Sequence, residues 1–261
     1  MRIASIGHAV FSVTMIGLGV VGLLYRDFVP VWNPVPLWVP AHELYLYLGS
    51  LVSLTTGIGL LVHRMAATAA RLLFATLFLW LLLFRLPEFF RTAPFEACWS
   101  VFPLAVILAA AWVLYVWFAA DWDRQHLRFI SGNSGLSIAR AVYGLSLIFF
   151  GVAHFIDVED TVSLIPNWLA GHLFWAYFTG CAFVAAGMAI LIGLCARLAA
   201  CLSALQIALF LLLIWMPIVA SGSKVPFQWS ETILNAALLA GAWMIADSYR
   251  DKPWLATSRQ R

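Results

Sequence analysis

The sequence predicts an all-α membrane protein in which eight transmembrane helices form two parallel four-helix repeats. Of its 261 residues, 64% are hydrophobic and 10% are charged, whereas a soluble domain carries roughly 25% charged residues. Long apolar runs recur, and the second half repeats uncommon residues of the first. Crossing a hydrocarbon layer of about 30 Å takes roughly 20 apolar residues. Such runs predict helices, because lipid leaves the amides of an isolated strand unpaired.

Eight runs meet that length. They are expected at residues 5–25, 43–62, 68–87, 97–118, 136–156, 171–193, 197–217 and 229–247. The first follows a basic start, as a cleaved signal does, but residues 17–23 match the internal segment 149–155. We therefore expect it to be a retained helix. Pro87 and Pro217 are expected to end the third and seventh helices, because proline cannot donate to the helical ladder.

An internal repeat appears at an offset of 130 residues. The matching pairs are Pro36 and Pro166, Trp38 and Trp168, His42 and His172, Tyr47 and Tyr177, Gly57 and Gly187, Pro87 and Pro217, Trp99 and Trp229, and Ser100 and Ser230. Apolar composition alone does not bring such residues into one register. Because each copy has four helices, the two copies enter the membrane in the same direction. They are then related by an axis along the membrane normal.

Polar sequence separates the copies. We expect a first unit at residues 1–118, a cytoplasmic linker at 119–135, a second unit at 136–250 and a cytoplasmic tail at 251–261. The run Ser131-Gly-Asn-Ser-Gly135 predicts a flexible linker. Small residues such as Gly57 are expected to let the helices approach closely.

The orientation follows from Lys and Arg. Eleven of them fall at the termini and in the second, fourth and sixth loops, and four, Arg26, Arg85, Arg91 and Lys224, fall in the opposite loops. Basic residues favour the cytoplasmic side. We therefore expect a multi-pass protein of the cell inner membrane, surrounded by the lipid bilayer, with both termini cytoplasmic. The sequence has no basic patch with interleaved aromatic residues, so binding of nucleic acid is not expected.

Three features together resemble the DoxX-like family of four-helix membrane proteins. They are the segment Gly151-Val-Ala-His-Phe155, the Pro-x-Trp loops at residues 36–38 and 166–168, and a glycine-rich second helix. The resemblance covers nearly the whole chain, as two DoxX-like units, and implies a fold more than a reaction. Proteins related to this family include the membrane subunits of thiosulfate:quinone oxidoreductases. The first copy departs from the pattern, because Gly22-Leu23 stands where the second has His154-Phe155.

Polar side chains concentrate near the expected extracytoplasmic helix ends. The expected catalytic residues are His154, Asp157, His172 and Glu231, and the expected ligand-binding residues are Trp38, Trp168, His42 and Asn235. An ionisable group inside a membrane costs on the order of 2.5–3.5 kcal/mol, which favours a function. Near a helix end the side chain reaches the headgroups instead, which favours an interfacial role for His42, His172, Arg85 and Glu88. For His154 and Asn235, a satisfied polar group between helices is equally open.

Other residues predict structure rather than chemistry. The histidines lack the spacing of a metal site, so no metal is expected. Cys98, Cys181, Cys195 and Cys201 form no CxxC pair and predict packing residues. Trp80, Trp112 and Trp215 are expected in the core.

Two functions stay open. The resemblance implies a redox-linked membrane subunit with a quinone-type ligand between the two units. Such a ligand needs an apolar aromatic slot and groups that exchange protons with its oxygens. A redox partner subunit is then expected, because no electron carrier of the chain's own is recognisable. The alternative is a non-enzymatic scaffold, assembly factor, or small-solute or lipid-binding protein, which fits the scarcity of buried ionisable groups. The sequence leaves open whether the protein is an enzyme.

Overall fold

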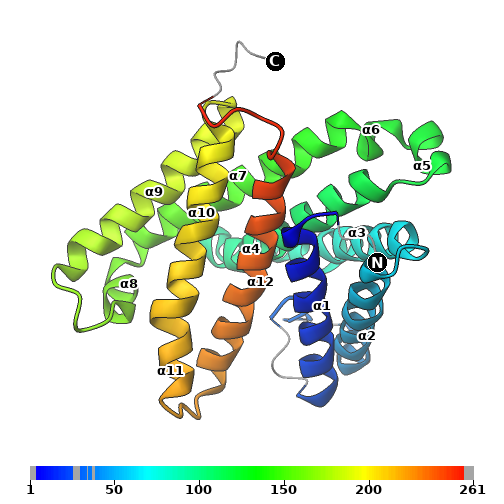
Figure 1. Ribbon diagram of the computed structural model, residues 1–261. Coiled ribbons are helices and arrows are strands. Elements are labelled where there is room, and N and C mark those ends of the chain that lie inside the picture. Colours follow the sequence, from blue (N-terminus) through cyan, green and yellow to red (C-terminus); the bar gives the residue numbers. More distant parts are fainter. Residues whose placement is uncertain (1–3, 26–29, 34, 37–38, 256–261) are drawn as a thin grey trace.

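The computed structural model describes residues 4–25, 30–33, 35–36 and 39–255, a part of the chain that is helical and contains no strand (Figure 1). The first half forms α1 (Ile6–Leu24), α2 (His42–Leu61), α3 (Ala66–Trp80), the π-helical turn η1 (Leu81–Arg85), the 3₁₀ turn η2 (Leu86–Phe90) and α4 (Pro94–Phe118). Two short helices follow, α5 (Asp121–His126) and α6 (Arg128–Ser131). The second half forms α7 (Asn133–Ile156), α8 (Val158–Leu164), α9 (His172–Ile192), α10 (Ala196–Phe210), the π-helical turn η3 (Leu211–Trp215), α11 (Met216–Ala220) and α12 (Pro226–Ser248).

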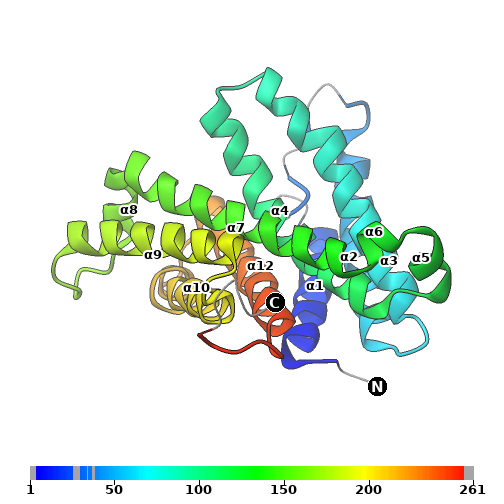
Figure 2. The ribbon, with the colours of Figure 1, turned by 90° about the horizontal axis from the view of Figure 1, so that it is seen from above.

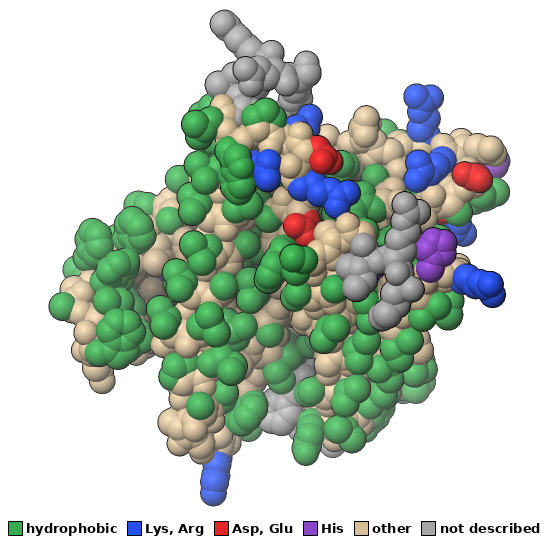
Figure 3. All heavy atoms as spheres, viewed as in Figure 1, with side chains coloured by type: hydrophobic (Ala, Val, Ile, Leu, Met, Phe, Trp, Pro, Cys, Tyr) green, Lys and Arg blue, Asp and Glu red, His purple; other side chains and the backbone are tan. Residues whose placement is uncertain are grey.

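Within the described part of the chain, seven helical segments are long and apolar enough to cross a membrane. One runs from α3 through η2 and another from α10 through α11, while α12, with 23 residues, is not among the seven. Large apolar side chains stay exposed along these segments: Leu83 is 56% exposed, Phe178 52% and Leu212 58%. On the face in Figure 3, apolar side chains cover most of the surface and most charged ones gather towards the top. Such a surface indicates a membrane protein.

The two halves pack in the same order. In the first half α1 packs on α2, α2 on α3 and α3 on α4; in the second half α7 packs on α9, α9 on α10 and α10 on α12. Across the halves, α4 contacts α7 and α12, and α12 contacts α1. The helices do not share one axis: from above, α10 and α12 appear nearly end-on while α7 and α9 lie lengthwise (Figure 2). The core lies around α4, where Ala109, Ala110 and Ala111 are fully buried.

Local features also recur 130 residues apart. Ala41 and Gly171, which precede α2 and α9, both have left-handed backbone with φ of 55° and 78°. A Cβ atom on Gly57 would lie 2.8 Å from the Ser12 carbonyl oxygen, and one on Gly187 would lie 2.5 Å from the Gly144 carbonyl oxygen. Glycine at these two positions lets α2 approach α1 and α9 approach α7, because small residues permit close backbone contact.

The prediction that Pro87 and Pro217 end their helices was wrong. Both follow a π-helical turn, η1 or η3, and the chain continues as η2 or α11. The Leu86 amide donates to the Leu81 carbonyl and the Met216 amide to the Leu211 carbonyl, so each bond reaches back five residues. A proline ring clashes with the carbonyl four residues earlier in an α-helix. The wider π turn accommodates the ring.

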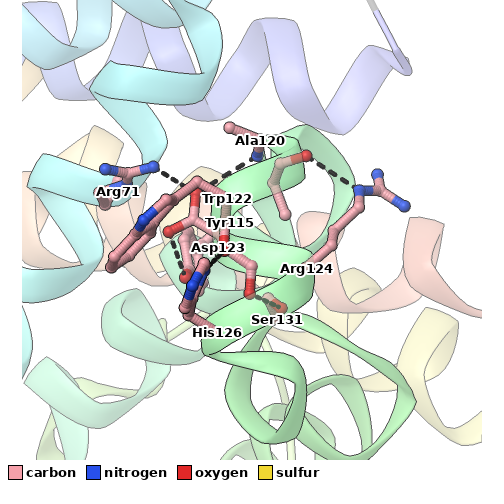
Figure 4. A network of polar contacts seen from close by, with 9 residues as sticks. Arg71, Tyr115, Ala120, Trp122, Asp123, Arg124, His126 and Ser131 are labelled. Carbon is pink, nitrogen blue, oxygen red and sulfur yellow. Dashed lines mark hydrogen bonds and ion pairs between the residues drawn. The ribbon is translucent and has the colours of Figure 1, made fainter.

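The segment expected to be a flexible linker is ordered by a buried carboxylate (Figure 4). Asp123 on α5 is 1% exposed. Its carboxylate accepts hydrogen bonds from Arg71 Nη2 on α3 at 2.5 Å and from the Tyr115 hydroxyl on α4 at 3.1 Å. The Ser131 hydroxyl donates to the Asp123 carbonyl at 3.1 Å, which fixes α6 to α5. The expected linker is thus bound to the first half, and α7 begins within it, at Asn133.

The core tryptophans are placed as predicted, but the cysteines less so. Trp80, Trp112 and Trp215 are all less than a tenth exposed. The four cysteines are free thiols, three of them half-buried and Cys181 exposed on α9. An exposed thiol on an apolar helix faces the surrounding medium rather than the core.

We expect Asp123→Asn to destabilise the protein, because Arg71 and Tyr115 lose a charged acceptor. The loss of a charge-assisted hydrogen bond costs about 1–3 kcal/mol, so the thermal unfolding midpoint in detergent should fall. Asp121→Asn is the matched control, because Asp121 lies on the same helix and is exposed. Equal midpoints for the two variants would contradict the role assigned to Asp123.

Candidate functional site

The connections between the long helices alternate along the chain, and we call the two sets the loop side and the linker side. The loop side carries η2, α8 and the turn between α11 and α12. The linker side carries residues 4–5, the turn between α2 and α3, α5, α6 and residues 249–255. The predicted site residues that the structure describes are placed differently: His42, His154 and His172 lie in the first or last turn of a helix, Asp157 and Trp168 between helices, and Glu231 and Asn235 within α12. The elements α8 and α11 stand well apart in Figure 1.

His154 lies in the last turn of α7 in an aromatic setting. Its ring centroid is 5.6 Å from that of Phe183 on α9 and 5.9 Å from that of Phe210 at the end of α10. Nδ1 lies 2.7 Å from the Phe150 carbonyl oxygen. A carbonyl only accepts, so Nδ1 carries the hydrogen and Nε2 of the neutral ring is an acceptor. Among the described residues, none hydrogen-bonds Nε2.

The other predicted catalytic residues are not joined to His154. Asp157 is the half-buried residue between α7 and α8, His172 is the first residue of α9, and Glu231 is half-buried in α12. Within the described ranges, no hydrogen bond or ion pair connects the four side chains, and no group of three or more His, Cys, Asp or Glu is placed to hold a metal ion. The structure therefore supports His154 as a centre more than it supports a four-residue cluster.

The predicted ligand-binding residues do not close a pocket together. Trp38 lies outside the described residues. Trp168 is 70% exposed, so most of its side chain is not packed against the rest of the protein. His42 is the first residue of α2, and Asn235 lies one turn after Glu231 on α12 and is half-buried.

Arg85 is buried, so the prediction that it is interfacial was wrong. It lies in η1 and is 1% exposed. Its Nη2 donates to the Val31 carbonyl at 3.3 Å and to the Asn33 carbonyl. Carbonyls of the segment between α1 and α2 thus pair with Nη2 of the guanidinium, which fixes that segment over the helices. A lone Arg in an apolar run was the sequence signal for this role.

Beside Arg85 lies an aromatic cluster that sequence reasoning missed. The Trp80 ring is 4.8 Å from Trp32 and 4.7 Å from Phe84, and Trp32 Nε1 donates to the Ser53 hydroxyl at 2.9 Å. Trp80 Nε1 is buried and has no hydrogen-bond partner in the described part of the chain. Buried donors are nearly always paired in proteins. The indole N–H of Trp80 is therefore an exception, an unsatisfied donor within the first half.

A groove of about 630 Å³ lies on the linker side, away from the predicted site. It is lined by Ala4, His63, Ala66, Ala67, Trp117, Phe118, Ala119 and Arg250. These residues come from four separate segments of the chain, so their spacing in the sequence gave no sign of a common site.

Comparison with known proteins gives a partial match. A family model described as a domain of unknown function, DUF8561, matches residues 143–246. That range holds most of α7 and nearly all of α12, so the second half of the chain is similar to this domain. No curated protein matches the chain, and no solved structure matches it either.

We expect Arg85→Ala to destabilise the protein, because the Val31 and Asn33 carbonyls lose their donor. A buried acceptor left unsatisfied costs about 1–3 kcal/mol, measured as a lower thermal unfolding midpoint in detergent. Arg85→Lys, which keeps a donor, should fall between wild type and Arg85→Ala. Lys224→Ala removes an exposed cation on the loop side and should leave the midpoint unchanged. A normal midpoint for Arg85→Ala would contradict the role of the guanidinium.

Proposed function

We propose that the chain is an integral membrane protein of two parallel DoxX-like four-helix units that crosses the bilayer eight times. The equal packing order of the halves and the π turns 130 residues apart support a duplication. The eighth span is α12, which is long enough at 23 residues and has the position in its half that α4 has in the first. The excess of Lys and Arg on the linker side supports cytoplasmic termini.

We further propose that His154 binds a quinone-type ligand in its reduced, hydroxyl-bearing form. The observation that carries this proposal is the state of the imidazole: Nδ1 is held on the Phe150 carbonyl, Nε2 is left as an acceptor, and the ring packs against Phe183 and Phe210. A planar apolar ring with a hydroxyl group fits this setting, because the rings of Phe183 and Phe210 stack with it while Nε2 accepts its hydrogen bond.

The chain's own chemistry would be proton acceptance. His154 Nε2 takes the hydroxyl proton, while the Nδ1 bond to Phe150 keeps the ring oriented. Glu231, Asp157 and His172 are the other ionisable groups proposed for this site, and no described contact joins them to His154. A bound quinol supplies a two-electron redox couple, and its electrons require a partner subunit, because the chain shows no electron carrier.

A non-enzymatic scaffold or assembly factor is the second candidate. It is favoured by the lack of any described contact that joins His154, Asp157, His172 and Glu231. Under this function the polar groups serve packing, and the protein purifies with a stable partner and shows no redox response to thiosulfate or another reductant.

We expect His154→Ala to abolish any quinol-linked activity while the protein remains inserted and stable. Binding of decylubiquinol, followed by quenching of tryptophan fluorescence, should weaken about tenfold, because a lost hydrogen bond is worth about 1.5 kcal/mol. His126→Ala is the matched control, because His126 Nδ1 contacts the Trp122 carbonyl in the same helical geometry on the linker side. Unchanged binding in His154→Ala would remove this residue from the site.

The proposed topology predicts opposite accessibility for two single cysteines. With the four native cysteines replaced, Gln125→Cys on α5 and Ser163→Cys on α8 both present exposed positions. A membrane-impermeant maleimide added to intact cells should label Ser163→Cys, and should label Gln125→Cys after permeabilisation alone. Labelling of both from one side would overturn the arrangement of spans.

A further inference from the structure

The linker-side groove forms where the two halves meet the chain ends. Its walls come from Ala4 before α1, from His63, Ala66 and Ala67 around the start of α3, from residues 117–119 at the end of α4 and from Arg250 after α12. With a volume of about 630 Å³, it is large enough for a lipid headgroup and the first part of an acyl chain.

The corresponding positions of the second half carry larger side chains that are in contact with other residues. Residues 130 positions after Ala67 and Ala119 are Arg197 and Tyr249. The Arg140 guanidinium lies 3.9 Å from the centroid of the Tyr249 ring and Nε donates to the Ser248 hydroxyl at 3.0 Å. Arg197 lies 4.1 Å from the Trp254 ring. The first half has alanine at both positions, and both alanines line the groove.

The open groove has a cationic rim and an apolar floor. Arg250 Nη1 donates to the Ala4 carbonyl at 2.9 Å, and its guanidinium lies 5.2 Å from the Trp117 ring. About half of the Arg250 side chain is exposed, and its Nε lies 3.8 Å from the exposed carboxylate of Asp251. His63 is exposed on the rim, no Asp or Glu is among the lining residues, and Ala66, Ala67 and Phe118 form the floor.

We propose that this groove binds an anionic phospholipid of the surrounding bilayer. Its phosphate lies at Arg250 and His63, and one acyl chain follows Ala66, Ala67 and Phe118. Arginine donates charge-assisted hydrogen bonds to phosphate, and basic pockets at helix ends are suited to anionic headgroups. A zwitterionic lipid carries its own cation, which weakens its attraction to this rim. This site is separate from the ligand proposed at His154.

Native mass spectrometry of the purified full-length protein tests the proposal. Wild type, delipidated in detergent and then mixed with equal amounts of phosphatidylglycerol and phosphatidylcholine, should retain phosphatidylglycerol preferentially. Arg250→Gln should lower that retention about tenfold, because it removes the phosphate donor. Ala67→Leu should lower it too, because the added side chain fills the floor without changing charge. Arg64→Gln is the control, since Arg64 is an exposed neighbour of His63 outside the lining.

Three results would overturn the assignment. Equal retention of the two lipids would show that the rim does not select for charge. A loss in Arg64→Gln as large as in Arg250→Gln would show a diffuse surface attraction. Displacement of the lipid by inorganic phosphate alone would show a site for a soluble anion. If Arg250→Gln fails to fold, Ala67→Leu and His63→Gln decide the question, and full retention in both would overturn the proposal.

Discussion

Most polar side chains that the described chain carries into its apolar interior have a partner within the protein, and this constraint governs the rest of the structure. Unpaired buried groups cost free energy because lipid offers no hydrogen bonds. Arg85 meets the constraint through carbonyls of the segment between α1 and α2, and Asp123 meets it through Arg71 and Tyr115. In both cases a paired charge holds a connecting segment against the helices, so the loops are ordered by the groups that they satisfy.

Two histidines show how this constraint separates structure from candidate chemistry. His8 is fully buried, with Nε2 3.1 Å from the Leu60 carbonyl oxygen and Nδ1 accepting from the Ala4 amide at 3.2 Å. Both nitrogens are used, so His8 is a structural residue that fixes α1 to the end of α2. His154 uses one nitrogen in the same way and leaves the other without a described partner. That difference is the reason for assigning the ligand to His154.

The two halves are alike in packing but different in what they leave open. The first half has an unsatisfied indole at Trp80 and a groove beside Arg250, whereas the second half has Arg197 and Tyr249 at the positions that match Ala67 and Ala119 of the groove. The second half has His154 where the first has Gly22.

The sequence alone determined the helical class, the membrane character and the approximate bounds of the long helices, because apolar length and composition depend on local residues and their solvent. It also indicated that Trp80, Trp112 and Trp215 belong in the core. Only the tertiary structure decided that Arg85 is buried, that residues 121–131 are ordered by Asp123, and that a π turn carries the chain past Pro87 and Pro217. Only the tertiary structure, likewise, brought Ala4, His63, Trp117 and Arg250 around one groove. Each of these features depends on partners that are distant in the chain or on hydrogen bonds that residue type does not specify. The spacing of residues along the sequence therefore does not predict them.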